Sequence, residues 1–122
     1  MTALRVLVVE DDGMIAMAIE DILAQMGHLV CGTAGTESEA VAAAEHSSPD
    51  LIIVDGRLRV GSGLLAMRTI LSHGFVPHIY ISGDRLLADT LDRDAVVLRK
   101  PFGETDLAGA IVRALAARNP AT

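Results

Sequence analysis

The sequence predicts an α/β fold built on one five-stranded parallel sheet with helices on both sides. Short runs rich in Val, Ile and Leu alternate with stretches of helical spacing, and this order repeats five times without a linker. Most of the runs are apolar on both faces, which is typical of strands covered by helices. Because consecutive parallel strands need crossover connections, we expect an open sheet with right-handed crossovers.

Five segments have the composition of strands. They are residues 4–9, 28–34, 50–55, 77–82 and 95–99. Pro49, Pro77 and Pro101 fall at segment boundaries, where the missing N–H does no harm. Cys31 is interpreted as a core residue, because it lies in an apolar context and no second cysteine suggests a disulfide or a metal site.

Helical spacing is found between these segments, at residues 13–26, 37–46, 62–73, 84–92 and 104–117. The first helix should follow an N-cap at Asp12 and end at Gly27, and segment 84–92 is the weakest helix. Met14 and Met17 are interpreted as packing residues. The side chains expected to face the core are Ile15, Ile19, Ile22, Leu23, Met26, Val41, Ala44, Leu65, Ile70, Leu71, Leu107, Ile111 and Leu115.

Length and composition narrow the class of protein. The 122 residues suit one domain, with a core over 4–117 and a flexible tail over 118–122. A net charge of -6 and an aromatic content of 2% argue against a nucleic-acid surface. No apolar run approaches the roughly 18 residues of a membrane span, and no signal peptide is recognisable, so we expect a cytoplasmic protein that does not contact a membrane.

Polar residues stand at the carboxyl ends of four predicted strands. Glu10 and Asp11 follow the first, Asp55 ends the third, Ser82 ends the fourth and Lys100 follows the fifth. Ligands of open parallel sheets bind at this edge. If the first and third strands are neighbours, three carboxylates converge, which is unfavourable unless a cation such as Mg²⁺ lies among them.

A carboxylate beside such a cation can attack phosphorus and form an aspartyl phosphate. Lys100 would supply a compact positive charge and Ser82 a hydroxyl for the transferring group. Taken singly, Glu10 and Asp11 could be solvated acids and Lys100 a loop lysine. Their joint placement at strand ends instead predicts a phosphoryl-transfer site.

Four motifs in this order resemble the receiver domain of bacterial two-component response regulators: VLVVEDD, LIIVDGRLRVGSG, YISGD and LRKPF. The resemblance covers about residues 4–117. It implies strand order 2-1-3-4-5 in a flavodoxin-like three-layer sandwich, with a short or irregular fourth helix. It also implies a signalling switch more than an enzyme, which catalyses its own phosphorylation and slow dephosphorylation.

The resemblance also implies residue roles. Asp55 would accept a phosphoryl group from a histidine kinase or phosphotransfer protein. Mg²⁺ would be held by Glu10, Asp11, Asp55 and the backbone carbonyl of Arg57. In the same comparison Gly63 is the loop-closing glycine, Ser82 the hydroxyl switch residue, and Lys100 the lysine that precedes a cis bond to Pro101.

The chain departs from the family pattern in three places. Leu58 and Arg59 stand where Met-Pro is usual, so the loop loses a stiff element and gains a second cation beside Arg57. Val97 stands where an aromatic switch residue is usual, so the coupled rotation of hydroxyl and ring cannot operate as usual. The short stretch between Ser82 and Lys100 is similar to stand-alone receivers with a Phe-Ala-Thr-Gly-like fourth strand.

The expected downstream partner is a protein that binds the face formed by the fourth helix, the fifth strand and the fifth helix, where Leu86, Leu87 and Leu91 are candidate contacts. The expected oligomeric state is a monomer or weak homodimer. One alternative function is a phosphorylation-independent adaptor that uses the same face. Another is a flavin-binding protein of similar topology, but the acids after the first strand would repel its phosphate.

Overall fold

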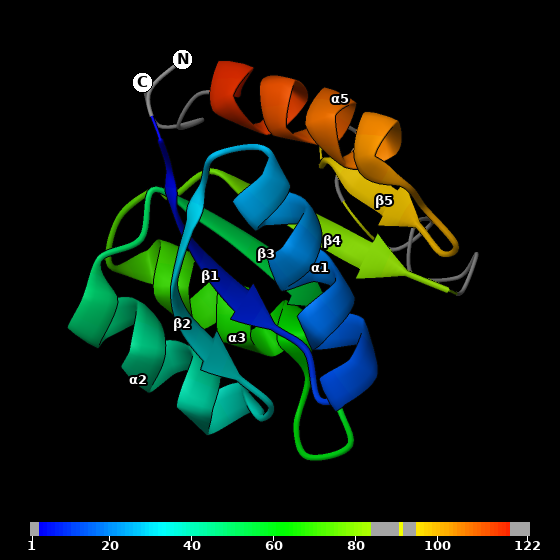
Figure 1. The fold of residues 1–122 in the computed structure, drawn as a ribbon. Helices are drawn as coiled ribbons and strands as arrows, with labels where there is room; N and C mark the ends of the chain where they lie inside the picture. The colour runs from blue at the N-terminus through cyan, green and yellow to red at the C-terminus, as the bar shows by residue number, and fades with distance from the viewer. Residues whose placement is uncertain (1–2, 84–90, 92–94, 118–122) are drawn as a thin grey trace.

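The computed structural model describes residues 3–83, 91 and 95–117, which form a three-layer sandwich around a parallel sheet (Figure 1). The strands are β1 (Arg5–Val9), β2 (Leu29–Ala34), β3 (Leu51–Asp55), β4 (His78–Ser82) and β5 (Val97–Arg99). The helices are α1 (Gly13–Gln25), α2 (Glu37–Ser47), α3 (Gly63–Ser72) and α5 (Glu104–Ala116). The fourth helix expected at 84–92 lies outside the described residues, apart from Leu91.

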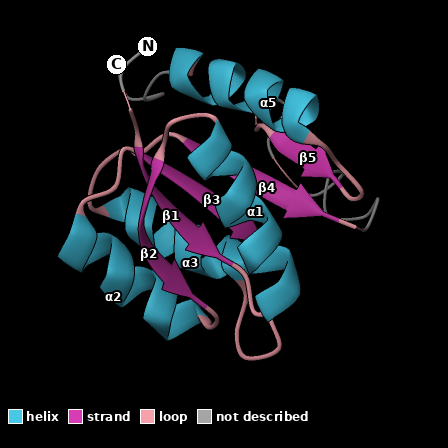
Figure 2. Ribbon diagram, viewed as in Figure 1, coloured by secondary structure: helices cyan, strands magenta, loops and turns pink. Residues whose placement is uncertain are grey.

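All strand pairs are parallel and their order is β2-β1-β3-β4-β5, which confirms the predicted topology. The five arrows run in one direction, and loops gather beyond their tips (Figure 2). No helix in the described part of the chain has both the length and the apolar character needed to cross a bilayer. The edge at the arrow tips is where the predicted site residues must lie.

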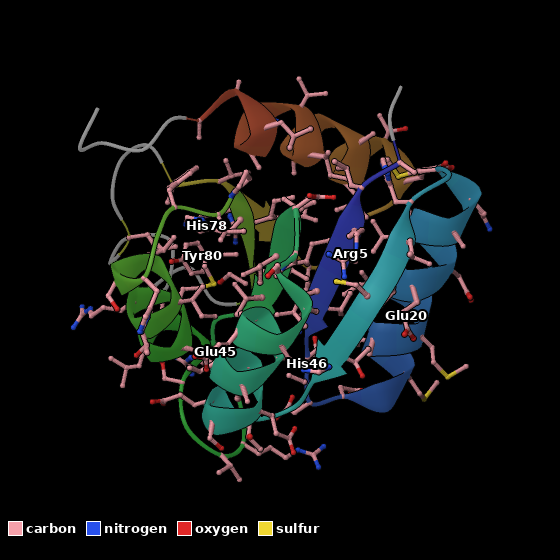
Figure 3. The ribbon with its side chains drawn as sticks, turned by 90° about the vertical axis from the view of Figure 1, so that its left-hand side faces the viewer. Arg5, Glu20, Glu45, His46, His78 and Tyr80 are labelled. Carbon is pink, nitrogen blue, oxygen red and sulfur yellow. The ribbon has the colours of Figure 1, made fainter. Side chains whose placement is uncertain are left out.

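Two apolar clusters lie on opposite faces of the sheet. One joins Val6, Val8, Ile53 and Ile81 to Ile19 and Leu23 of α1 and to Leu107 and Ile111 of α5. The other joins Leu7, Val9, Ile52 and Val54 to Ala40 of α2 and to Met67 and Ile70 of α3, and includes Tyr80. Tyr80 and His78 lie on β4 with their rings in an edge contact, at a centroid distance of 5.3 Å (Figure 3). Alternate residues of β1 and β3 therefore serve different helix layers.

Several residues expected in the core are instead exposed. Leu65 of α3 and Leu115 of α5 are 46% and 45% exposed, because they lie outside the buried faces of these helices. The buried side chains are Ala66, Met67 and Ile70 in α3 and Leu107, Ala110, Ile111 and Ala114 in α5. The prediction of inward packing was wrong for both leucines. The buried stripe of each helix is therefore narrower than the apolar pattern suggests.

The outer face of α1 and the edge strand β2 also differ from expectation. Met14 and Met17 are 82% and 63% exposed, on the side of α1 away from Ile19 and Leu23. Their interpretation as packing residues was wrong, since they add to the apolar pattern without facing the sheet. Cys31 is only half-buried, because it lies on β2, which pairs with β1 at the border of the sheet.

The first helix is capped as predicted. Asp12 lies in extended backbone, and its Oδ1 accepts hydrogen bonds from Met14 N at 2.9 Å and Ile15 N at 3.3 Å. This use of Asp12 satisfies backbone donors that a helix start otherwise leaves free. Glu10 and Asp11 therefore remain for the site.

Gly63 begins α3 in direct contact with the end of β3. A Cβ at this position would collide with the backbone carbonyl oxygen of Asp55 and would lie 2.9 Å from Val54 Cγ2. Only a glycine permits the helix to start this close to the strand. The prediction that Gly63 closes the loop thus has a steric basis.

We expect Gly63→Ala to lower the free energy of unfolding by about 2–4 kcal/mol, because the strand end or the helix must move to admit a methyl group. Gly13→Ala is the matched control, since a Cβ there meets nothing within 4 Å. That change should be neutral or stabilising by up to about 1 kcal/mol. Urea unfolding measures both, and equal effects would contradict the steric argument.

Candidate functional site

The register of the sheet brings the predicted site residues to one edge. Val9 is paired with Val54, Asp55 with Ile81, and Ser82 with Arg99, so these strands end at nearly the same level. Lys100 N donates a hydrogen bond to Ser82 O at 2.9 Å, which extends the pairing one residue past β5. The predicted cis peptide bond between Lys100 and Pro101 is present.

Lys100 reaches two of the acids. Its Nζ donates a hydrogen bond to Asp55 Oδ2 at 3.0 Å and lies 3.5 Å from Glu10 Oε1. Burial lowers the pKa of Lys100, but the hydrogen bond and the charge of Asp55 outweigh it, and the pKa is raised. Lys100 is therefore a fixed cation between β1 and β3.

Glu10 is the least exposed acid of the site. It is 6% exposed, and its Oε2 accepts a hydrogen bond from Asp12 N at 3.1 Å. Its buried Oε1 has no hydrogen-bond partner among the described residues, although Lys100 is near. Burial raises the pKa of Glu10 to about 7, and the charge of Asp55 acts in the same direction. A buried carboxylate oxygen that has no hydrogen-bond partner is suited to bind a cation.

Asp11 lies at the outer side of the cluster and is bound by the loop that follows β3. Its Oδ2 accepts a hydrogen bond from Arg59 N at 2.6 Å, and Arg59 Nε lies 3.9 Å from the same oxygen. Burial raises the pKa of Asp11, but the backbone hydrogen bond and the charge of Arg59 help to lower it overall. Asp11 is therefore held as an anion.

Glu10, Asp11 and Asp55 together form a donor set for a hard cation. Each offers a carboxylate oxygen, and the three oxygens lie within 4.8 Å of one another. Oxygen donors of this kind suit Mg²⁺, and the buried Glu10 Oε1 lacks any other hydrogen-bond partner among the described residues. Arg57 N donates to Asp55 Oδ1 at 3.0 Å, which holds this residue's backbone beside the acids.

The loop from Gly56 to Ser62 is fastened to α2 as well as to Asp11. Ser62 N donates to Glu37 Oε1 at 2.9 Å, and Val60 forms a bridge with Thr36. Gly61 lies against the Glu37 side chain with a φ of +83°, a conformation that favours glycine. The loop beside Asp55 is therefore tied to Asp11, which follows β1, and to Glu37 at the start of α2.

Ser82 is 2% exposed at the end of β4. It lies on the strand next to Asp55, and a Cβ built on the following Gly83 would be 3.8 Å from Lys100 Cδ, which is ordinary contact. Val97 is paired with Tyr80 across β4 and β5, so the sheet has an aromatic ring one strand away from the position where the family usually has one.

Sequence reasoning anticipated the acids, Ser82 and Lys100 but missed two contacts. Arg59 was expected to add a cation beside Arg57, and its bonds to Asp11 were not anticipated. Glu37, which holds Ser62 N, was not singled out at all. The sequence gives only a weak signal for these two contacts, because both depend on the path of the loop after β3.

Comparisons with known proteins agree with this geometry. The family model described as the response regulator receiver domain matches residues 6–112. The phyllosphere-induced regulator PhyR of Methylorubrum extorquens is 37% identical over 117 residues, covering 93% of this chain and 44% of PhyR. The transcriptional regulatory protein PdtaR of Mycobacterium tuberculosis is 35% identical over 111 residues, covering 88% of this chain and 54% of PdtaR. The chain thus spans about half the length of these relatives.

A solved structure extends the similarity to three dimensions. The solution structure of the Erythrobacter litoralis PhyR receiver domain superposes with a TM-score of 0.86 at 33% identity, covering 98% of this chain and 95% of that one. The superposition therefore includes nearly all of both chains. Taken with the family match over residues 6–112, the strand order and the acids at the sheet edge, this shows that the chain belongs to the response regulator receiver domain family.

Proposed function

We propose that Asp55 is the phospho-acceptor of this receiver and that its phosphorylation switches a protein-binding surface. The observation that carries the proposal is the hydrogen bond of 3.0 Å between Lys100 Nζ and Asp55 Oδ2 inside the cluster of acids. A lysine fixed on one carboxylate oxygen places a positive charge where a phosphoryl oxygen would arrive. Asp55 is the last residue of β3 and is only 7% exposed, at the edge of the sheet where a donor would have to approach it.

The proposed reaction is a phosphoryl transfer to a carboxylate oxygen. An oxygen of Asp55 attacks the phosphorus of a phosphohistidine on a kinase or phosphotransfer protein, the new O–P bond forms, and the P–N bond breaks. The electron pair of the broken bond leaves with the histidine nitrogen. In this proposal Lys100 compensates charge on the phosphoryl oxygens, and the Ser82 hydroxyl donates a hydrogen bond to one of them.

Mg²⁺ is the cation we propose for the donor set of Glu10, Asp11 and Asp55, with the backbone carbonyl of Arg57 as a fourth ligand. When bound, it would neutralise the acids and the incoming phosphoryl oxygens. Two observations support this assignment: the buried Glu10 Oε1 has no hydrogen-bond partner among the described residues, and oxygens of the three carboxylates lie within 4.8 Å of one another.

We further propose that residues 4–117 act as one receiver domain in the cytoplasm, where a histidine kinase or phosphotransfer protein donates the phosphoryl group. The downstream partner would be a protein that binds the face near β5 and α5, with the chain a monomer or weak homodimer. Exposed Val112 and Leu115 on α5 support a protein contact there.

We expect Asp55→Asn to abolish covalent phosphorylation by acetyl phosphate and Mg²⁺, because the amide oxygen is a poor nucleophile. Asp21→Asn is the matched control, since Asp21 is exposed on α1. Intact-protein mass spectrometry should find one added phosphoryl group in the wild type and the control. A wild type that gains no phosphate from acetyl phosphate or from a cognate kinase would overturn the proposal, and partner binding unchanged by Asp55→Asn would favour an adaptor.

The raised pKa of Glu10 predicts that the metal-free protein loses stability as the pH rises. Glu10 ionises near 4.5 when unperturbed and near 7 in the fold, so between these values the folded state holds a proton that the unfolded chain has released. Raising the pH from about 5 to about 8 should lower the free energy of unfolding by about 1–3 kcal/mol from this group. Urea unfolding in a chelator measures the change.

Glu10→Gln is the control for this pH dependence, because it keeps the shape of the side chain and removes its titration. Its stability should fall less over the same pH range. Mg²⁺ should stabilise the wild type more at about pH 8 than at about pH 6, because binding requires the ionised carboxylate. Identical pH profiles for the two proteins would exclude Glu10 as the titrating group.

A further inference from the structure

Arg59 meets the acidic cluster at the carboxylate that Lys100 does not contact. Lys100 Nζ is 3.0 Å from Asp55 Oδ2 and 3.5 Å from Glu10 Oε1, whereas Asp11 Oδ2 forms an ion pair with Arg59 Nε at 3.9 Å. The Arg59 side chain is 80% exposed and comes from the loop after β3. Two cations of different exposure, Lys100 at 29% and Arg59 at 80%, therefore lie against the three acids.

The two contacts between Arg59 and Asp11 have different consequences. The backbone N–H bond of 2.6 Å fixes the loop on Asp11 and does not depend on the side chain. The guanidinium adds a positive charge that favours the ionised carboxylate, and it can leave without unfolding the loop. The backbone hydrogen bond holds the loop in place, whereas the guanidinium can be replaced at Asp11 by another cation.

We propose that the Arg59 guanidinium is a resident cation of the metal-free site, which competes with Mg²⁺ for Asp11 and weakens the affinity for the metal. This rests on the proposed use of Glu10, Asp11 and Asp55 as Mg²⁺ ligands. A bound dication would repel a guanidinium held against one of its ligands, so the side chain turns out to solvent when the metal enters. Arg59 thus sets the Mg²⁺ concentration at which the receiver becomes competent for phosphorylation.

The size of the effect follows from the exposure of the side chain. Exposed ion pairs are weak and screened by salt, so we expect Arg59 to change the Mg²⁺ dissociation constant about two- to fivefold. The same screening predicts that the effect shrinks toward zero at about 0.5 M NaCl.

The test is a Mg²⁺ titration of the full chain, followed by isothermal titration calorimetry and by backbone amide shifts, without any phosphoryl donor. Arg59→Gln keeps the N–H bond to Asp11 and removes the charge, so its dissociation constant should fall about two- to fivefold. Arg59→Lys keeps the charge and should stay closer to the wild type. Arg113→Gln, in the last turn of α5, is the control for net charge and should leave the constant unchanged.

The outcomes separate this inference from the proposed function. If the wild type and Arg59→Gln both bind Mg²⁺ with equal affinity, or if Arg59→Gln binds more weakly, the competition is refuted while the metal site stands. If neither protein binds Mg²⁺, the metal site itself is refuted, and the competition with it. If Arg113→Gln increases the affinity for Mg²⁺ as much as Arg59→Gln does, the effect comes from net charge in general, and the inference is overturned.

Discussion

The crowding of three carboxylates at one end of a parallel sheet is the constraint on which this site depends. Glu10 and Asp11 follow β1 and Asp55 ends β3, and the pairing of Val9 with Val54 brings the three acids to the same edge of the sheet. Lys100 compensates two of them from the far strand, through the pairing that carries its backbone past Ser82. A shift of any of these strands by one residue would separate Lys100 from the acids that it neutralises. The chemistry of the site therefore requires this sheet register.

Most of the fold and the composition of the site could be predicted from the sequence. Short apolar runs separated by helical stretches specify a parallel sheet, and parallel strands place their carboxyl ends together, so Glu10 and Asp55 could be assigned to one site from the sequence alone. Burial was less predictable at the helix margins. Leu65 and Leu115 continue an apolar pattern, yet they are exposed, while neighbouring residues such as Ala66 and Ala114 are buried.

The contacts of the loop after β3 were out of reach of sequence reasoning. Arg59 and Asp11 are 48 residues apart, and their meeting depends on the backbone path rather than on any periodicity. Arg59 stands where the family usually has a proline, which has no backbone N–H. The backbone N–H that Arg59 has instead donates the hydrogen bond to Asp11. The chain thus exchanges a stiff loop residue for a hydrogen bond, so the loop remains fixed by different means.

The packing of Gly61 against Glu37 has a consequence for sequence variation among relatives. A side chain at position 61 would occupy the space of the Glu37 side chain, and the φ of +83° adds a backbone cost. The two positions are therefore coupled, although 24 residues separate them and neither is an acid of the site. Relatives with a larger residue at the position of Gly61 should have a shorter residue at that of Glu37 and another acceptor for the N–H of Ser62.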